Sequence, residues 1–162
     1  MPGASIDGLE SLEARLDSLP AALGAALMAK AQTLADALAD KIRSDKLSGQ
    51  ILNVRSGALR ASIEASVASD GDGISATVGS VGDVKYAAIQ EYGGKTAAHE
   101  ILPAKAQALA FLEGGALRFA HRVEHPGSII PERSYLRSSL EEMSAGILAA
   151  LEAAAQQAWE QT

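Results

Sequence analysis

Apolar residues recur at helical spacing near both ends of the chain and at strand spacing in its middle. A first stripe has steps of 3, 4 and 3, typical of an amphipathic helix: Leu9, Leu12, Leu16 and Leu19. Pro20 interrupts it, since proline disfavours helix at the preceding residue and suits the first turn of a new helix. A second stripe follows, with alanine at most positions between: Leu23, Leu27, Leu34, Leu38 and Ile42. The pattern therefore predicts two helices before Leu47.

The centre of the chain carries a hairpin signal and a short helix. Two runs of small and β-branched residues, 66–69 and 74–79, flank the turn sequence Asp70-Gly71-Asp72-Gly73. Such a turn between two strand-like runs favours a β-hairpin. Residues 86–92 suit a short helix, and Gly93-Gly94 suits its C-terminal cap.

Two more strands are expected after Pro103, at about 107–112 and 117–124, with a turn at Glu113-Gly114-Gly115. The second of them alternates at strand period: Leu117, Phe119, His121 and Val123. A long helix closes the sequence, with a stripe at steps of 3 and 4: Leu136, Leu140, Met143, Ile147, Leu151, Ala154 and Ala158.

These elements predict a single α+β domain over residues 1–162. Residues 1–47 form an N-terminal helical segment, 48–131 a β-rich centre with short helices, and 132–162 the C-terminal helix. The expected architecture is an antiparallel sheet of about four strands, flanked by the long terminal helices and a short central helix.

Composition changes the picture of the core. The chain is 48% hydrophobic, but 33 of its 162 residues are alanine and only 4% are aromatic. Alanine favours helix and lets helices approach closely, whereas large side chains supply most of the buried area of a core. We therefore expect a thinly stabilised monomer, with much of its apolar surface buried against other chains.

The charge pattern argues against a dedicated nucleic-acid binder. Fourteen basic against 20 acidic residues give a net charge of −6, with 9 of each sign in residues 48–137 and 4 acidic but no basic residues in 138–162. Nucleic-acid binders usually carry a basic excess. We expect no membrane contact, since no apolar run approaches about 20 residues. Without a signal peptide at its start, the chain is expected to be made in the cytosol.

The search for a catalytic or cofactor site ends without a candidate. The chain has no cysteine, and its glycine pairs lack the spacing of a phosphate-binding loop. The best metal candidate is His121 with Glu124 and His125, yet on a strand His121 and Glu124 point to opposite faces. No catalytic residue, metal ligand or cofactor is predicted, and His99 is given no role.

The candidate subunit-interface residues are all arginines: Arg55, Arg60, Arg118, Arg122, Arg133 and Arg137. On one strand, Arg118 and Arg122 would share a face. The favoured interpretation is ion pairing with acidic groups of adjacent subunits; solvated surface and direct phosphate contact are the alternatives. By the same reasoning the acidic end of the last helix is expected to dock on a basic neighbour.

Four segments follow one another along the chain: ILNVRSGALRASI at 51–63, YAAIQEYGG at 86–94, ILPAKAQALAF at 101–111, and HPG at 125–127 followed by PERSYLR at 131–137. In order and spacing they resemble the phage neck or tail-completion family of long-tailed double-stranded DNA phages. Within them or beside them lie the candidate core-signature residues: Gly57, Tyr86, Tyr92, Gly93, Phe111, Phe119 and Tyr135. We expect the five aromatics to join sheet and helices in the core; an interface role for some of them is the alternative.

The resemblance implies a structural virion protein of the neck and no enzyme. Relatives of this kind assemble as rings, by resemblance hexameric, between the head-side connector or stopper protein and the tail-tube or tail-terminator protein. The ring would complete the tail and join it to the head, with at most passive contact with DNA in its lumen. The alternative within the class is a tail-terminator ring that caps polymerisation of the tail tube.

Overall fold

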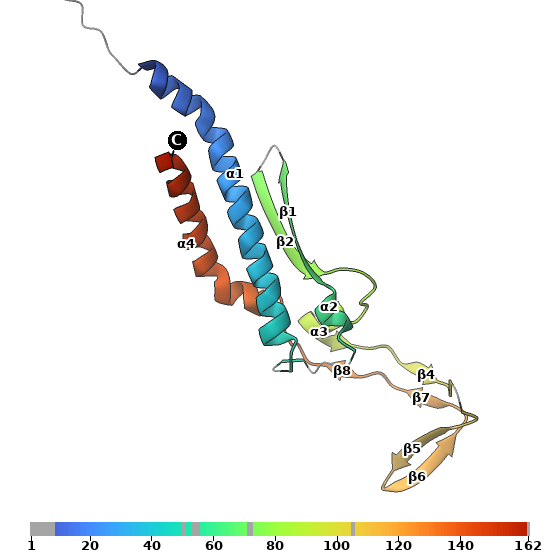
Figure 1. The fold of residues 1–162 in the computed structure, drawn as a ribbon. Coiled ribbons are helices and arrows are strands. Elements are labelled where there is room, and N and C mark those ends of the chain that lie inside the picture. The colour runs from blue at the N-terminus through green and yellow to red at the C-terminus, as the bar shows by residue number, and fades with distance from the viewer. Residues whose placement is uncertain (1–8, 50, 53–55, 71–72, 105, 162) are drawn as a thin grey trace, which may run out of the picture. The chain divides into compact units, whose positions relative to one another are not determined.

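The computed structural model describes residues 9–49, 51–52, 56–70, 73–104 and 106–161 (Figure 1). The chain divides into two compact units, one of Met1–Ala87 with Ser134–Thr162 and one of Ala88–Arg133. The elements follow in the order α1 (Leu9–Lys41), η1 (Ile42–Lys46), α2 (Ala58–Ala61), β1 (Ile63–Asp70), β2 (Gly73–Ser80), α3 (Ala87–Tyr92), β3 (Gly94–Lys95), β4 (His99–Ile101), β5 (Leu109–Glu113), β6 (Ala116–Ala120), β7 (Val123–His125), β8 (Ile129–Ile130) and α4 (Arg137–Gln161).

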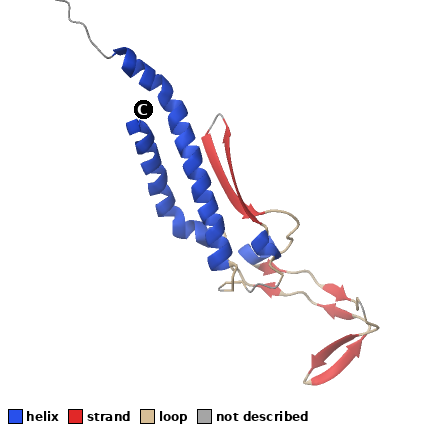
Figure 2. Ribbon diagram, viewed as in Figure 1, coloured by secondary structure: helices blue, strands red, loops and turns tan. Residues whose placement is uncertain are grey.

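The predicted α+β class is confirmed: in sequence order, long helices lie near both ends of the chain and antiparallel strands lie in its middle (Figure 2). The prediction of one sheet of about four strands is wrong for the described residues. They form four separate two-stranded sheets, β1–β2, β3–β8, β4–β7 and β5–β6. Outside the β1–β2 hairpin the strands have only two to five residues, and Pro103 and Pro126, which cannot donate to a ladder, lie between them, so no long strand forms there to extend a common sheet.

The prediction of two N-terminal helices is also wrong. The structure has one helix, α1, that runs through Pro20, and it ends in the single π-helical stretch η1. Strong helix formers on both sides of Pro20 offset the loss of the backbone hydrogen bond that proline cannot donate. The carbonyl left without that bond belongs to Leu16, an exposed residue, where water can satisfy it.

In the first unit the β1–β2 hairpin lies on α1 (Figure 1). Ile63 pairs with Ser80 and Ala65 with Val78, so these residues share one face. That face is apolar: Ile63 is fully buried, and Ala65 and Val78 pack against the core. The alternate residues, such as Glu64 and Thr77, are exposed, which is the pattern of a strand covered on one side only.

The core of the first unit gathers apolar residues from α1, η1, the segment after it, α2, β1 and the residues just before α4: Leu38, Ala39, Ile42, Leu47, Leu52, Leu59, Ile63 and Tyr135. The Tyr135 hydroxyl donates to the carbonyl of Ala87 at 3.3 Å, and the buried Ser139 hydroxyl donates to the carbonyl of Tyr135 at 2.7 Å. Helix α4 packs along α1, with buried alanines on both helices, as expected for close approach.

The second unit is a ribbon of short antiparallel pairs held by tight backbone turns. Gly93 follows α3 with φ +68° and Gly127 follows His-Pro with φ +86°. A Cβ at Gly93 would lie 2.7 Å from the backbone nitrogen of Glu132, and one at Gly127 would lie 2.1 Å from the carbonyl oxygen of Thr96. Glycine is therefore required at both positions. The strand predicted over 117–124 is divided between β6 and β7, because the chain turns away at His121-Arg122.

Candidate interaction surfaces

The candidate arginines do not form one cluster on a strand. Arg122 lies beyond the end of β6 and pairs with Glu100 at 3.2 Å and Glu124 at 3.8 Å. Arg118, on β6, pairs with Glu113 at 3.5 Å. Both arginines are largely exposed and their carboxylate partners belong to the same chain. An ion pair at such an exposed position contributes little to stability.

Three further candidate arginines lie at separate places along the chain. Arg60 is exposed in the last turn of α2, and Arg137 is the first residue of α4. Arg133 is exposed, and its backbone N–H donates to the carbonyl of Gln90 at 2.9 Å. Arg55 lies outside the described residues.

The histidines are engaged with backbone groups and with each other. His99 and His125 are directly opposite on β4 and β7, and their rings stack with centroids 5.1 Å apart. The His125 Nδ1 accepts the N–H of Gly127 at 3.0 Å, and the His121 Nδ1 donates to the carbonyl of Gln107 at 2.9 Å. Among the described residues no three His, Asp or Glu side chains gather as a metal site would require.

The core-signature residues separate into buried and exposed positions. Tyr135 is 1% exposed in the core, and Gly57 takes φ +76° before α2. Four aromatics are exposed in the chain by itself: Tyr86, Tyr92, Phe111 and Phe119. Of the five aromatics predicted to lie in the core, only Tyr135 is buried.

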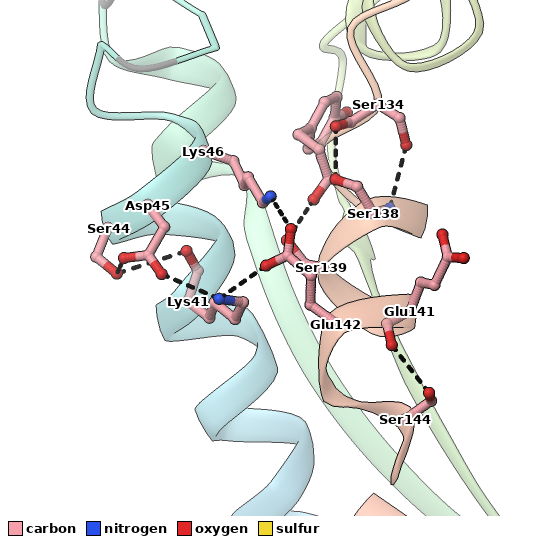
Figure 3. A network of polar contacts seen from close by, with 11 residues as sticks. Lys41, Ser44, Asp45, Lys46, Ser134, Ser138, Ser139, Glu141, Glu142 and Ser144 are labelled. Atoms are coloured by element: carbon pink, nitrogen blue, oxygen red, sulfur yellow. Dashed lines mark hydrogen bonds and ion pairs between the residues drawn. The ribbon is translucent and has the colours of Figure 1, made fainter. Parts of the chain in front are cut away.

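A polar network that the sequence analysis did not anticipate connects the end of α1 to α4 (Figure 3). One carboxylate, that of Glu142, accepts from two lysines: Lys41 at 2.9 Å and Lys46 at 2.5 Å. Lys41 also pairs with Asp45 at 3.2 Å. The sequence signal was weak, because Lys46 and Glu142 stand 96 positions apart.

The network shifts the ionisation of three of its groups. Hydrogen bonds from Lys46 and then Lys41 hold the pKa of Glu142 below its usual value. Hydrogen bonds to Glu142 and then Asp45 raise the pKa of Lys41. The Ser44 hydroxyl and Lys41 lower the pKa of Asp45. All three shifts favour the charged forms. We call this set of ion pairs between the end of α1 and α4 the clamp.

An apolar groove of about 410 Å³ lies in the first unit between α1, β2 and α4, and we call it the α1–α4 groove. Leu34 and Leu38 of α1, Ala76 of β2, and Leu140 and Ile147 of α4 contribute to its lining. The main polar contributions come from Thr77 and Arg137. Such a lining suits an apolar partner.

A second apolar surface lies on the β5–β6 hairpin in the second unit. Leu112 pairs with Leu117 and Ala110 with Phe119, so all four share one face, which we call the hairpin face. Leu112, Leu117 and Phe119 are 74%, 59% and 68% exposed. The signal that could have found this face is the Gly114-Gly115 turn, because a two-residue turn fixes which residues are opposite.

These features define the class: an α+β protein whose prominent surfaces are apolar and suited to contacts with other chains. The comparison with family models supplies the identity. Residues 10–93 match the family described as "Bacteriophage HK97-gp10, putative tail-component". The match covers more than half of the 162 residues, so the chain belongs to the HK97-gp10-like family, a family of structural phage tail components.

The matched region runs from the first turn of α1 through the β1–β2 hairpin to Gly93. It contains one of the four sequence segments that carried the resemblance, 51–63, and all but the last residue of another, 86–94. The comparison with curated proteins gave no match, and neither did the comparison with solved structures. In the described part of the chain, no helix combines the length and apolar character that a membrane span needs.

Proposed function

We propose that this tail component is a subunit of a ring in the phage neck, between the head-side connector or stopper protein and the tail tube. The ring would complete the tail and join it to the head. The observation that carries the proposal is the family match over residues 10–93. The order of the four sequence segments, which continues to residue 137, favours the neck over other parts of the tail.

Assembly into a homo-oligomeric ring, hexameric by resemblance, accords with the distribution of apolar surface. Large hydrophobic side chains are exposed on α1, α4 and the β5–β6 hairpin: Leu12, Leu16, Leu140, Leu148, Trp159, Leu112, Leu117 and Phe119. Extended apolar surface of this kind marks contacts with other chains. Because both units carry exposed apolar surface, one subunit can contact its neighbours within the ring and also tail-tube or connector proteins.

Contact with DNA would be passive. The net charge of −6 opposes strong phosphate binding, and two arginines of the second unit, Arg118 and Arg122, pair with glutamates of their own chain. Phosphate contacts confer affinity when basic side chains that are not already paired displace the counterions of the DNA. A lumen lined by such a surface lets DNA pass without holding it.

A phage with the gene for this chain interrupted tests the proposal. Electron microscopy of the lysate should show DNA-filled heads and finished tails that are not joined, and the wild-type gene in trans should restore joining. Tails of irregular excess length would instead identify a tail terminator, the alternative role. Infectious particles that assemble normally without the chain, or purified particles that never contain it, would refute a neck role.

A further inference from the structure

We propose that the hairpin face of one copy docks into the α1–α4 groove of the next copy, an inference that rests on the ring assembly proposed above. The occupant of the groove is thus a second copy of this chain. Three observations carry the proposal: an uncovered apolar hairpin, an apolar groove of matching character, and an unpaired strand edge beside that groove.

The hairpin needs a cover that the described chain does not give it. An isolated two-stranded hairpin is marginally stable in water, and three or more strands or a packed helix are normally needed. The β1–β2 hairpin has α1 on its apolar face, whereas Leu112, Leu117 and Phe119 on β5–β6 remain mostly exposed. A partner that buries these side chains would stabilise the hairpin and gain the apolar transfer energy at the same time.

The groove favours an extended occupant over a helical one. Ala76 and Thr77 are consecutive on β2 and so point to opposite faces of the strand, yet both line the groove. The groove therefore runs along the edge of β2. Within the described residues β2 pairs only with β1, so this edge has backbone groups available for another strand.

The sequence of β2 supports strand addition. Gly73–Ser80 contains no charged residue and no proline, the devices that natural edge strands use against pairing with other chains. An incoming strand of the hairpin could hydrogen-bond to this edge while its side chains contact Leu34, Leu140 and Ile147. This is β-augmentation combined with apolar docking.

The contact is heterologous, since a patch on one copy meets a different patch on the next. Such contacts form rings when the rotation closes. A hairpin of 12 residues, 109–120, is small beside the roughly 20–30 residues a side of a standard interface. One contact is therefore weak, and closure of a ring, which gives every copy two contacts, supplies the missing stability.

Paired substitutions test this geometry. Leu117→Asp disables the hairpin face and Leu140→Asp disables the groove; both residues are at least half exposed, so the folded unit tolerates the change. Each variant alone should weaken self-association at least tenfold. At protein concentrations high enough to populate a single weak contact, an equimolar mixture should form a dimer and no larger assembly, because one intact hairpin meets one intact groove. The matched controls are Ala149→Asp, exposed on α4 outside the groove lining, and Ala116→Asp, on the other hairpin face; both should assemble like the wild type.

Cysteine crosslinking supplies a second measurement, because the chain has no cysteine of its own. Chains with Leu117→Cys and chains with Leu140→Cys should form disulfides between copies under mild oxidation, both as purified protein and in purified particles. Self-assembly of Leu140→Asp at wild-type strength would overturn the proposal. So would a disulfide within one chain of the double-cysteine variant, or a crosslink from Leu140→Cys to another virion protein. Particles that contain the chain but give no crosslink would refute the docking and leave the neck role intact.

Discussion

The two hairpins of this chain are built alike and differ in what covers them. Both are two-stranded and antiparallel with one apolar face. The apolar face of β1–β2 contacts α1 and contributes the fully buried Ile63 to the core. The apolar face of β5–β6 has the larger side chains, and they are exposed. The difference teaches that apolar pattern alone does not identify a core: the same alternation can serve folding in one hairpin and contact with another chain in the other.

The units that contain the hairpins differ in the same way. Every buried apolar residue of the described chain belongs to the first unit, whereas in the second unit the buried side chain is that of Glu91. The first unit is thus stabilised by side-chain packing. The second relies on backbone pairing and on glycine turns where neighbouring backbone comes very close.

The largest expected effect separates the two hairpins directly. Ile63→Ala should lower the free energy of unfolding by about 2–5 kcal/mol, because it leaves a cavity in a fully buried site. Leu117→Ala should change it by less than about 0.5 kcal/mol, since the side chain is already in water. Urea unfolding at a concentration low enough to prevent assembly measures both. Equal losses in the two variants would show that the chain covers its own hairpin face and would remove the contrast.

A smaller effect is expected at the turn of the second unit. Gly127→Ala places a methyl group against the Thr96 carbonyl and strains a residue at φ +86°, which costs at least about 1–3 kcal/mol locally. The amides of Thr96 and Ser128, which bond across this turn, should exchange with solvent at least about tenfold faster.

Gly82→Ala is the matched control for that experiment. Gly82 has a similar φ of +78°, but a Cβ there meets no atom within 4 Å. It should therefore produce backbone strain without a clash, and it should leave exchange at Thr96 and Ser128 unchanged. Unaltered exchange in Gly127→Ala would mean that the turn does not hold the second unit together.

Local sequence signals predicted the parts of the fold that local forces determine. The helical stripe of α4, the hairpin around 70–73 and the cap at Gly93 were all visible in spacing and turn chemistry. The break expected at Pro20 was wrong because a proline rule describes an average cost, and the helix formers around this proline outweigh it.

Other parts of the fold have no local signal. The pairs β3–β8 and β4–β7 join residues more than 20 positions apart, with two or three residues in each strand, too few for a period to appear. The α1–α4 groove likewise depends on three elements from different parts of the chain. The stripes on α1 and α4 predicted apolar faces, but only tertiary packing decides which residues of a stripe, such as Leu38, are buried and which, such as Leu140, stay half open.

The smallest expected effect concerns the clamp of the first unit, and its sign follows from the shifted pKa values. The pKa of Glu142 is lowered from 4.5 in the folded state by Lys46 and Lys41, so its contribution is complete above pH 4.5 and is lost as the pH falls through the lower, folded value. Glu142→Gln keeps the shape and removes the charge. The wild type should therefore have the higher Tm at pH 7, and the two melting temperatures should converge below pH 4.5. Glu141→Gln, the neighbouring residue whose carboxylate makes none of these ion pairs, is the control and should follow the wild type at every pH. A Tm difference between wild type and Glu142→Gln that stays constant down to pH 3 would show that Glu142 acts through packing and not through its charge. The first unit would then differ from the second in side-chain packing alone, without an electrostatic contribution.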